Sequence, residues 1–197
     1  MKFRDESGVT LIELVVSMSI MLIMMAMVTG GIVEIYRSVG RTDAETEAQT
    51  QITAAYSRLD KEVRYARGVS KPATLDGDYY VEYQVDLDEV TTCVQLRVDT
   101  GVAELQRRTW VSGTDPPSPT AWTTLASNVT ATTPFTVSAV DIESLTGYRY
   151  QRLRLLATVT VGSGPSASSR VTDVTFTALN ATNPKNTENT CTEGRGV

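Results

Sequence analysis

Histidine is absent from the 197-residue sequence, and its absence removes several classes of function. Without imidazole the chain has neither the commonest general base, nor a Ser-His or Cys-His nucleophile pair, nor the commonest metal ligand. The sequence also lacks a Gly-x-Ser-x-Gly motif, a phosphate-binding loop ending in Lys-Ser/Thr, and a Cys-x-x-Cys pair. We therefore predict a protein that is not an enzyme and needs no cofactor. The alternative within catalysis is an exported enzyme that uses carboxylates alone.

Positive charge is also sparse. The formal net charge is -5, and lysine occurs only at positions 2, 61, 71 and 185. The longest basic cluster is the pair Arg107-Arg108, which we interpret as a solvated strand edge. Because nucleic-acid binding requires a basic patch or stripe, we predict no nucleic-acid partner.

Cysteine is nearly absent too, with Cys93 and Cys191 as its two occurrences. Two thiols without histidine make a poor zinc site, so we predict a disulfide if the domain is exported and two unpaired thiols otherwise. A disulfide closing so long a loop stabilises a fold by about 4 kcal/mol in the chain-entropy model. The acidic stretches 76–78 and 86–89 do not have EF-hand spacing, so we interpret them as solvated turns and predict no metal site.

One long segment carries no charge at all. It runs from Leu14 to Val33, and as a helix its 20 residues would span about 30 Å, the thickness of a bilayer core. The run is longer than the apolar region of a cleaved secretory signal, and no good Ala-x-Ala site follows it. An ordinary membrane anchor would not place an acid inside the apolar sequence, as Glu13 is placed here.

The position of Glu13 needs a physical explanation. A carboxylate at the centre of a membrane helix costs roughly 2.5 kcal/mol or more, and less near the end of the helix. Such a charge persists when it has a partner. Cleavage between Gly8 and Val9 would create an amine four residues before Glu13. In a filament of staggered identical helices, that amine can neutralise Glu13 of a neighbour.

The same residues carry a resemblance. The sequence Gly8-Val9-Thr10-Leu11-Ile12-Glu13, followed by the apolar run, resembles the cleavage motif of type IV prepilins and type II secretion pseudopilins. The resemblance implies that prepilin peptidase cuts after Gly8 and methylates the amine of Val9. It also implies that Glu13 is the carboxylate that guides assembly.

What the resemblance implies extends to location and partners. Residues 1–8 would be a leader on the cytoplasmic side, and residues 9–33 a single transmembrane and assembly helix. The expected partners are the lipid bilayer, prepilin peptidase, other pilin or pseudopilin subunits and an inner-membrane assembly platform. The globular domain would be extracytoplasmic, in the membrane and later in a surface or envelope filament.

Residues 34–67 continue the helix as an amphipathic segment. Small and apolar residues at spacings of three and four form one stripe: Ile52, Ala55, Tyr56, Leu59, Val63 and Ala66. Residues 41–51 have no such stripe, so they are either solvated or packed only through alanines. A continuous helix over 9–67 would be about 88 Å long and would end before Gly68. Residues 44–69 also resemble the helix end of W- and J-type minor pilins.

Beyond the helix the apolar period changes to two, which predicts strands. Residues 79–88 read as a half-buried strand, and further strands are predicted over 94–98, 102–110, 135–142, 153–161 and 171–179. Residues 162–169 read as a turn. We expect an α+β fold in which the long helix packs on an antiparallel sheet formed by residues 68–179. Residues 180–197 form a polar tail, poorly ordered unless Cys191 fastens it.

The resulting prediction is a minor pilin or pseudopilin that acts as a filament subunit or at a filament tip. The alternative is a membrane-anchored extracytoplasmic binding domain that never polymerises. The two differ in processing and in the need for Glu13. A binding domain would keep residues 1–8 and would tolerate Glu13→Gln.

Overall fold

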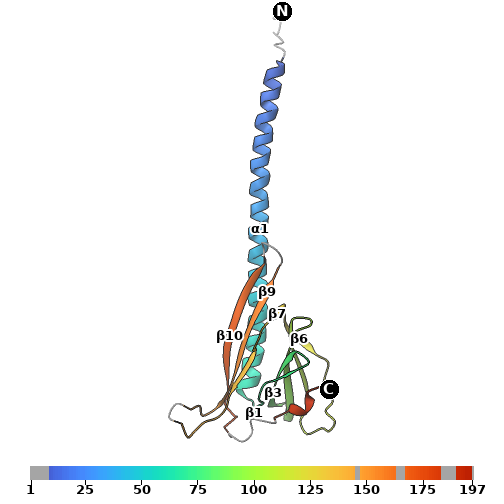
Figure 1. Ribbon diagram of the computed structural model, residues 1–197, viewed down its shortest axis with the longest axis vertical. Helices are drawn as coiled ribbons and strands as arrows, with labels where there is room; N and C mark the ends of the chain where they lie inside the picture. The colour runs from blue at the N-terminus through green and yellow to red at the C-terminus, as the bar shows by residue number, and fades with distance from the viewer. Residues whose placement is uncertain (1–8, 145–146, 163–166, 183–189, 197) are drawn as a thin grey trace, which may run out of the picture.

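The computed structural model describes residues 9–144, 147–162, 167–182 and 190–196. A single long helix, α1 (Leu11–Arg64), precedes two antiparallel sheets, as Figure 1 shows. The six-stranded sheet contains β1 (Gly68–Val69), β2 (Ala73–Leu75), β3 (Asp78–Leu87), β4 (Val90–Asp99), β5 (Glu104–Val111) and β6 (Thr123–Ser127). The four-stranded sheet contains β7 (Val129–Thr130), β8 (Phe135–Ser138), β9 (Gln151–Val161) and β10 (Ser168–Ala178). A short 3-10 helix, η3 (Thr192–Gly194), lies near the C-terminus. The predicted α+β fold is confirmed.

The sheets have simple connections. The larger has the order β1-β3-β4-β5-β6, with β2 also pairing with β3. The smaller has the order β10-β9-β7, with β8 also pairing with β9. The C-terminal half of α1 lies against β10, β9 and β6, so it packs along both sheets. The predicted single sheet is therefore divided in two, and one apolar core joins the helix and both sheets.

The helix is continuous over 54 residues, about 81 Å at 1.5 Å per residue. It passes through Gly30 and Gly31 without interruption, and a Cβ at either position would meet no atom within 4 Å. It ends at Arg64, three residues before the predicted end, because the chain there already joins the sheet. The Arg67 N–H donates to the carbonyl of Gln84 in β3 at 2.7 Å.

Only the second half of α1 is covered. Its buried residues are Ala44, Ala48, Ala55, Leu59 and Val63. Residues 41–51 thus pack through alanines, as one of the two alternatives predicted. Within the predicted stripe, Tyr56 differs, since it is 41% exposed and stacks obliquely on Phe176 with ring centroids 5.5 Å apart.

A nearly buried polar junction fixes α1 to the larger sheet. The Glu62 carboxylate accepts a hydrogen bond from the Tyr83 hydroxyl at 2.6 Å and from Arg107 Nε at 2.9 Å. Arg58, one turn before Glu62, donates to its other oxygen at 3.2 Å. The pKa of Tyr83 is raised well above its ordinary value of 10.0, mainly by burial of the hydroxyl and secondly by the negative charge of Glu62. The tyrosine therefore stays a neutral donor at any physiological pH.

We expect Glu62→Ala to lower the free energy of unfolding by about 3 kcal/mol, because it leaves the Arg107 charge buried and unpaired. Urea unfolding of the full chain in detergent micelles, followed by tryptophan fluorescence, measures the change. The matched control is Glu47→Ala, an exposed glutamate on the same helix, which should cost about 0.5 kcal/mol or less. Equal costs for the two variants would show that the junction does not hold the helix.

The prediction for Arg107-Arg108 was wrong, because both side chains are buried. Strand β5 lies between β4 and β6 and is not an edge. Successive residues of a strand point to opposite faces, so Arg107 reaches Glu62 on the helix side. Arg108 lies on the other face, where it donates to the carbonyl of Gly194 at 2.7 Å.

The half-buried character predicted for residues 79–88 is also wrong in the middle of the strand. Val81 and Tyr83 face the core as expected, but Glu82 on the opposite face is 0% exposed. Its neighbour in β4, Gln95, is equally buried. The reason is that the C-terminal residues cover this outer face of the larger sheet.

Several strand boundaries differ from the predicted ones: for example, β4 begins at Val90 rather than 94, and β9 begins at Gln151 rather than 153. Strand β5 begins at Glu104 rather than 102, because Ala103 has a φ of 56° and belongs to the turn. Strand β8 ends at Ser138, four residues early. Strand β10 begins at Ser168, inside the predicted turn, because it pairs with β9 as far as Val161.

Candidate functional site

The start of α1 is defined by a hydrogen-bonded cap. Thr10 is extended, with φ -77° and ψ 150°, and its hydroxyl accepts a hydrogen bond from the Glu13 N–H at 3.4 Å. The Leu14 N–H donates to the Thr10 carbonyl at 3.2 Å. Thr-x-x-Glu is the residue pattern of a capping box, which favours a helix starting at this point. The predicted cleavage residue Gly8 lies outside the described residues, while Val9 directly precedes the cap and is 70% exposed.

Glu13 therefore occupies the first turn of the helix. A negative charge is favourable there, since the helix dipole places partial positive charge at the N-terminus. The side chain is exposed, and none of the ion pairs formed by the described residues includes it. The carboxylate is thus presented outward, at the end of an apolar surface.

That apolar surface is the uncovered half of α1. Every residue from 9 to 39 is exposed, and Figure 1 shows this part of the helix projecting away from the sheets. An 18-residue stretch within the helix has a mean hydropathy of 2.4, so the helix is long and apolar enough to cross a membrane. The hydroxyls of Ser17 and Ser19 donate to the carbonyls of Glu13 and Val15 at 2.7 and 2.9 Å. Neither hydroxyl therefore presents an unsatisfied donor to an apolar environment.

The two cysteines lie far from this surface. Cys93 and Cys191 form a disulfide, with Cα atoms 5.6 Å apart and a sequence separation of 98. Together with Glu193 they bring three potential metal ligands within 4.8 Å of one another. Because metal binding requires thiolates, which a disulfide does not offer, this arrangement does not indicate a metal site.

Sequence reasoning missed the polar cluster beneath the C-terminal residues. Glu82 accepts from Gln95 Nε2 at 2.9 Å and forms a two-oxygen ion pair with Arg195. The strand pattern places Glu82 and Gln95 on the solvent side. The available signal was Arg195 itself, which lies four residues after a cysteine expected to fasten the tail.

Comparison with known proteins gives one match, at the N-terminus. Residues 3–29 match the family described as the prokaryotic N-terminal methylation motif. The match contains Gly8, Val9 and Glu13 as well as most of the apolar run. No curated protein and no solved structure matches the chain.

The motif, the exposed apolar helix and the sheet domain agree with one another. The motif implies processing by prepilin peptidase and assembly with other pilin subunits in general terms. The apolar helix agrees with membrane anchoring and an extracytoplasmic domain. At its N-terminus, the chain carries the prepilin-type methylation motif of type IV pilin-like precursors.

Proposed function

We propose that this chain is a minor pilin or pseudopilin, which acts as a structural subunit and not as an enzyme. It is inserted in the cytoplasmic membrane as a precursor and cleaved after Gly8 by prepilin peptidase. Its N-terminal helix then enters a type IV pilus-like or type II secretion filament, or the tip of one. The observation that carries the proposal is the uncovered apolar half of α1 with Glu13 near its end, in a chain with the methylation motif.

The membrane stage follows from the helix and the disulfide. Residues 14–33 provide about 30 Å of apolar helix, which fits a single pass through a bilayer. The Cys93–Cys191 bond favours an oxidising compartment for the globular domain, since cytosolic thiols are kept reduced. The leader would then remain on the cytoplasmic side, where the peptidase removes it.

The filament stage explains why an acid stands at the end of an apolar helix. Leaving the bilayer for a filament exchanges lipid for the apolar helices of other subunits. Cleavage gives Val9 an amine, which methylation leaves positively charged. A staggered neighbour can place this amine against Glu13 and neutralise both groups in the filament core. An assembly platform and a motor elsewhere would drive this step.

The finer assignment to the W- and J-type minor pilins is supported by residues 44–69. The resemblance in this segment includes Leu59, Glu62 and Val63. Here Leu59 and Val63 pack in the core, and Glu62 forms the junction with Arg107. These residues join the long helix to the sheet, which a filament subunit needs if force is to pass between them.

A strain without prepilin peptidase tests the proposal. Wild-type cells should contain the shortened chain both in membranes and in the sheared or purified filament fraction. Cells without the peptidase should hold the full-length chain in the membrane and none in filaments. A non-polymerising membrane-anchored binding domain would instead have the same length and the same membrane location in both strains.

A further inference from the structure

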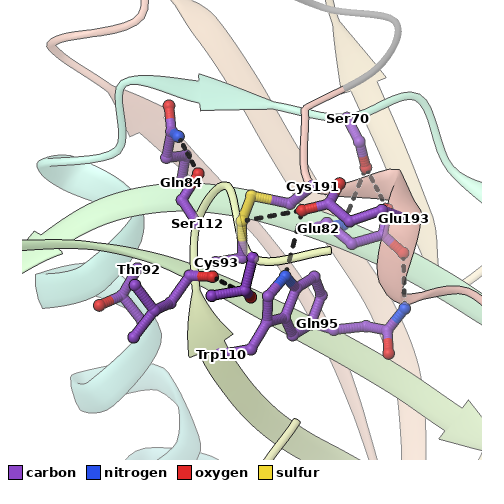
Figure 2. The surroundings of a disulfide bond; sticks show 12 residues. Ser70, Glu82, Gln84, Thr92, Cys93, Gln95, Trp110, Ser112, Cys191 and Glu193 are labelled. Atoms are coloured by element: carbon purple, nitrogen blue, oxygen red, sulfur yellow. Dashed lines mark hydrogen bonds between the residues drawn. A yellow bond between two sulfur atoms is a disulfide. The ribbon is translucent and has the colours of Figure 1, made fainter. Parts of the chain in front are cut away.

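The described C-terminal residues lie on the outer face of the larger sheet, opposite the helix. We call residues 191–195 the C-terminal latch. Its first residue, Cys191, is bonded to Cys93 in β4, and Figure 2 shows this bond beside Trp110 and Glu193. Trp110 Nε1 donates to Glu193 Oε1 at 3.1 Å. The latch is thus attached by a covalent bond at one end and by polar contacts beyond it.

At the other end of the latch, a guanidinium group fills a polar site in the sheet. Arg195 contacts both oxygens of Glu82, with Nε at 2.9 Å from Oε1 and 3.1 Å from Oε2. Its Nη2 also donates to the carbonyl of Lys71 at 2.6 Å and to the Ser70 hydroxyl at 3.2 Å. Oxygens of three residues therefore accept hydrogen bonds from one planar cation. A guanidinium suits this arrangement because its N–H groups point in several fixed directions in one plane.

The site is built without the latch. The Ser70 hydroxyl donates to Glu82 Oε2 at 2.6 Å and accepts from the Glu82 N–H at 2.8 Å. Gln95 Nε2 donates to Glu82 Oε1 at 2.9 Å, and its own oxygen accepts from Arg108 Nε at 2.8 Å. These partners belong to, or directly follow, paired strands of the larger sheet. These contacts to the carboxylate come from residues of the sheet and its connections, not from the latch.

With the latch in place, burial of Glu82 favours a positively charged partner. The Glu82 side chain is 0% exposed, while that of Arg195 is 21% exposed. A carboxylate buried without a counter-charge is costly, and the hydrogen bonds from Ser70 and Gln95 are neutral. The guanidinium of Arg195 is still in contact with solvent, whereas the carboxylate of Glu82 is not. The carboxylate therefore depends on groups of the protein for its hydrogen bonds and its counter-charge.

We propose that Glu82, Ser70 and the Lys71 carbonyl form a preformed guanidinium-binding site, and that Arg195 of the C-terminal latch is its intramolecular ligand. The disulfide attaches the latch four residues before this arginine. It thereby raises the effective concentration of the guanidinium at the site, as any short tether does. The buried carboxylate in turn gives the polar C-terminus a fixed place on the sheet.

Chemical rescue tests the site with the full chain in detergent micelles. Arg195→Ala should lower the melting temperature of the domain and leave the guanidinium site empty. Methylguanidinium, titrated from about 0.1 to 50 mM at constant ionic strength, should raise that temperature by several degrees in a saturable manner. Methylammonium carries the same charge without the planar fork and should give less than half of the rise.

Tryptophan fluorescence gives a second readout, because both tryptophans of the chain lie on this face. Trp110 contacts Glu193, and the guanidinium carbons of Arg97 and Arg108 each lie 4.3 Å from the centroid of the Trp122 ring. The emission of Arg195→Ala should shift with methylguanidinium along the same titration curve as the melting temperature.

Two controls make the result decisive. Wild type, whose site is filled, and Arg195→Ala/Glu82→Gln, whose site has lost its charge, should show no saturable response. An equal response in either control, or none in Arg195→Ala, would overturn the proposal. If Arg195→Ala does not fold alone, its refolding yield replaces the melting temperature, and failure of methylguanidinium to restore that yield overturns the proposal equally.

Discussion

A Glu13→Ala chain is expected to enter the membrane and lose its leader normally, yet to be absent from filaments. In a single membrane-inserted chain the alanine lowers the free-energy cost of insertion, since it removes a carboxylate from the edge of an apolar helix. In a filament it removes the counter-charge of the Val9 amine of a neighbouring subunit. The amine would then lie unpaired among apolar helices, at a cost of several kcal/mol per subunit. Filament incorporation should therefore fall at least 10-fold.

Fractionation and immunoblotting of membranes and sheared filaments measure this result. The matched control is Glu34→Ala, which removes an acid from the exposed helix beyond the apolar run, where it forms an ion pair with Arg37 at 3.8 Å. It should assemble at close to the wild-type level. Glu13→Asp keeps the charge with a shorter reach and should give an intermediate level. Wild-type assembly of Glu13→Ala would remove the electrostatic basis of the proposed filament.

The second large effect concerns the disulfide. Replacing both cysteines by alanine should lower the free energy of unfolding by about 4–5 kcal/mol, because the bond closes a loop with a sequence separation of 98 residues. The loss acts first through the unfolded state, which gains freedom, and then through the C-terminal latch, which loses its attachment. Without the latch, Glu82 and Gln95 are left on a sheet face that solvent can reach.

Urea unfolding of wild type and the double variant, with and without dithiothreitol, separates the disulfide from other effects of the substitutions. Dithiothreitol should lower the free energy of unfolding of wild type to nearly that of the double variant, because it breaks the disulfide. It should leave the free energy of unfolding of the double variant unchanged. A loss below about 1 kcal/mol would mean that the latch and the sheet are held together by non-covalent contacts alone.

Much of the fold was predictable because local patterns determine it. Twenty uncharged residues define the apolar half of the helix, and alternation defines the long strands β3, β4 and β9. Division of the strands into two sheets was not predictable, since alternation says which face of a strand is apolar but not which strand is its neighbour. The short strands β1 and β7 have two residues each and carry no period at all.

The functional residues also include some that the sequence predicts and some that it does not. Glu13 and its cap lie within a few residues of one another, so the motif and the helix start were readable in the sequence. The pair of Glu82 and Arg195 joins residues 113 positions apart, and it buries an acid that alternation assigns to solvent. Only the tertiary position of the C-terminal latch, itself dependent on the Cys93–Cys191 bond, brings these groups together.

The central claim is that this chain is a processed filament precursor whose new amine neutralises Glu13 of a neighbour. Intact-mass analysis of the native protein, purified from membranes of cells that contain the peptidase, tests it most directly. The account predicts the mass of a chain that begins at Val9, with one methyl group added to its amine and the Cys93–Cys191 bond intact. A chain that still carries Met1–Gly8, or one cut at another position, would contradict it.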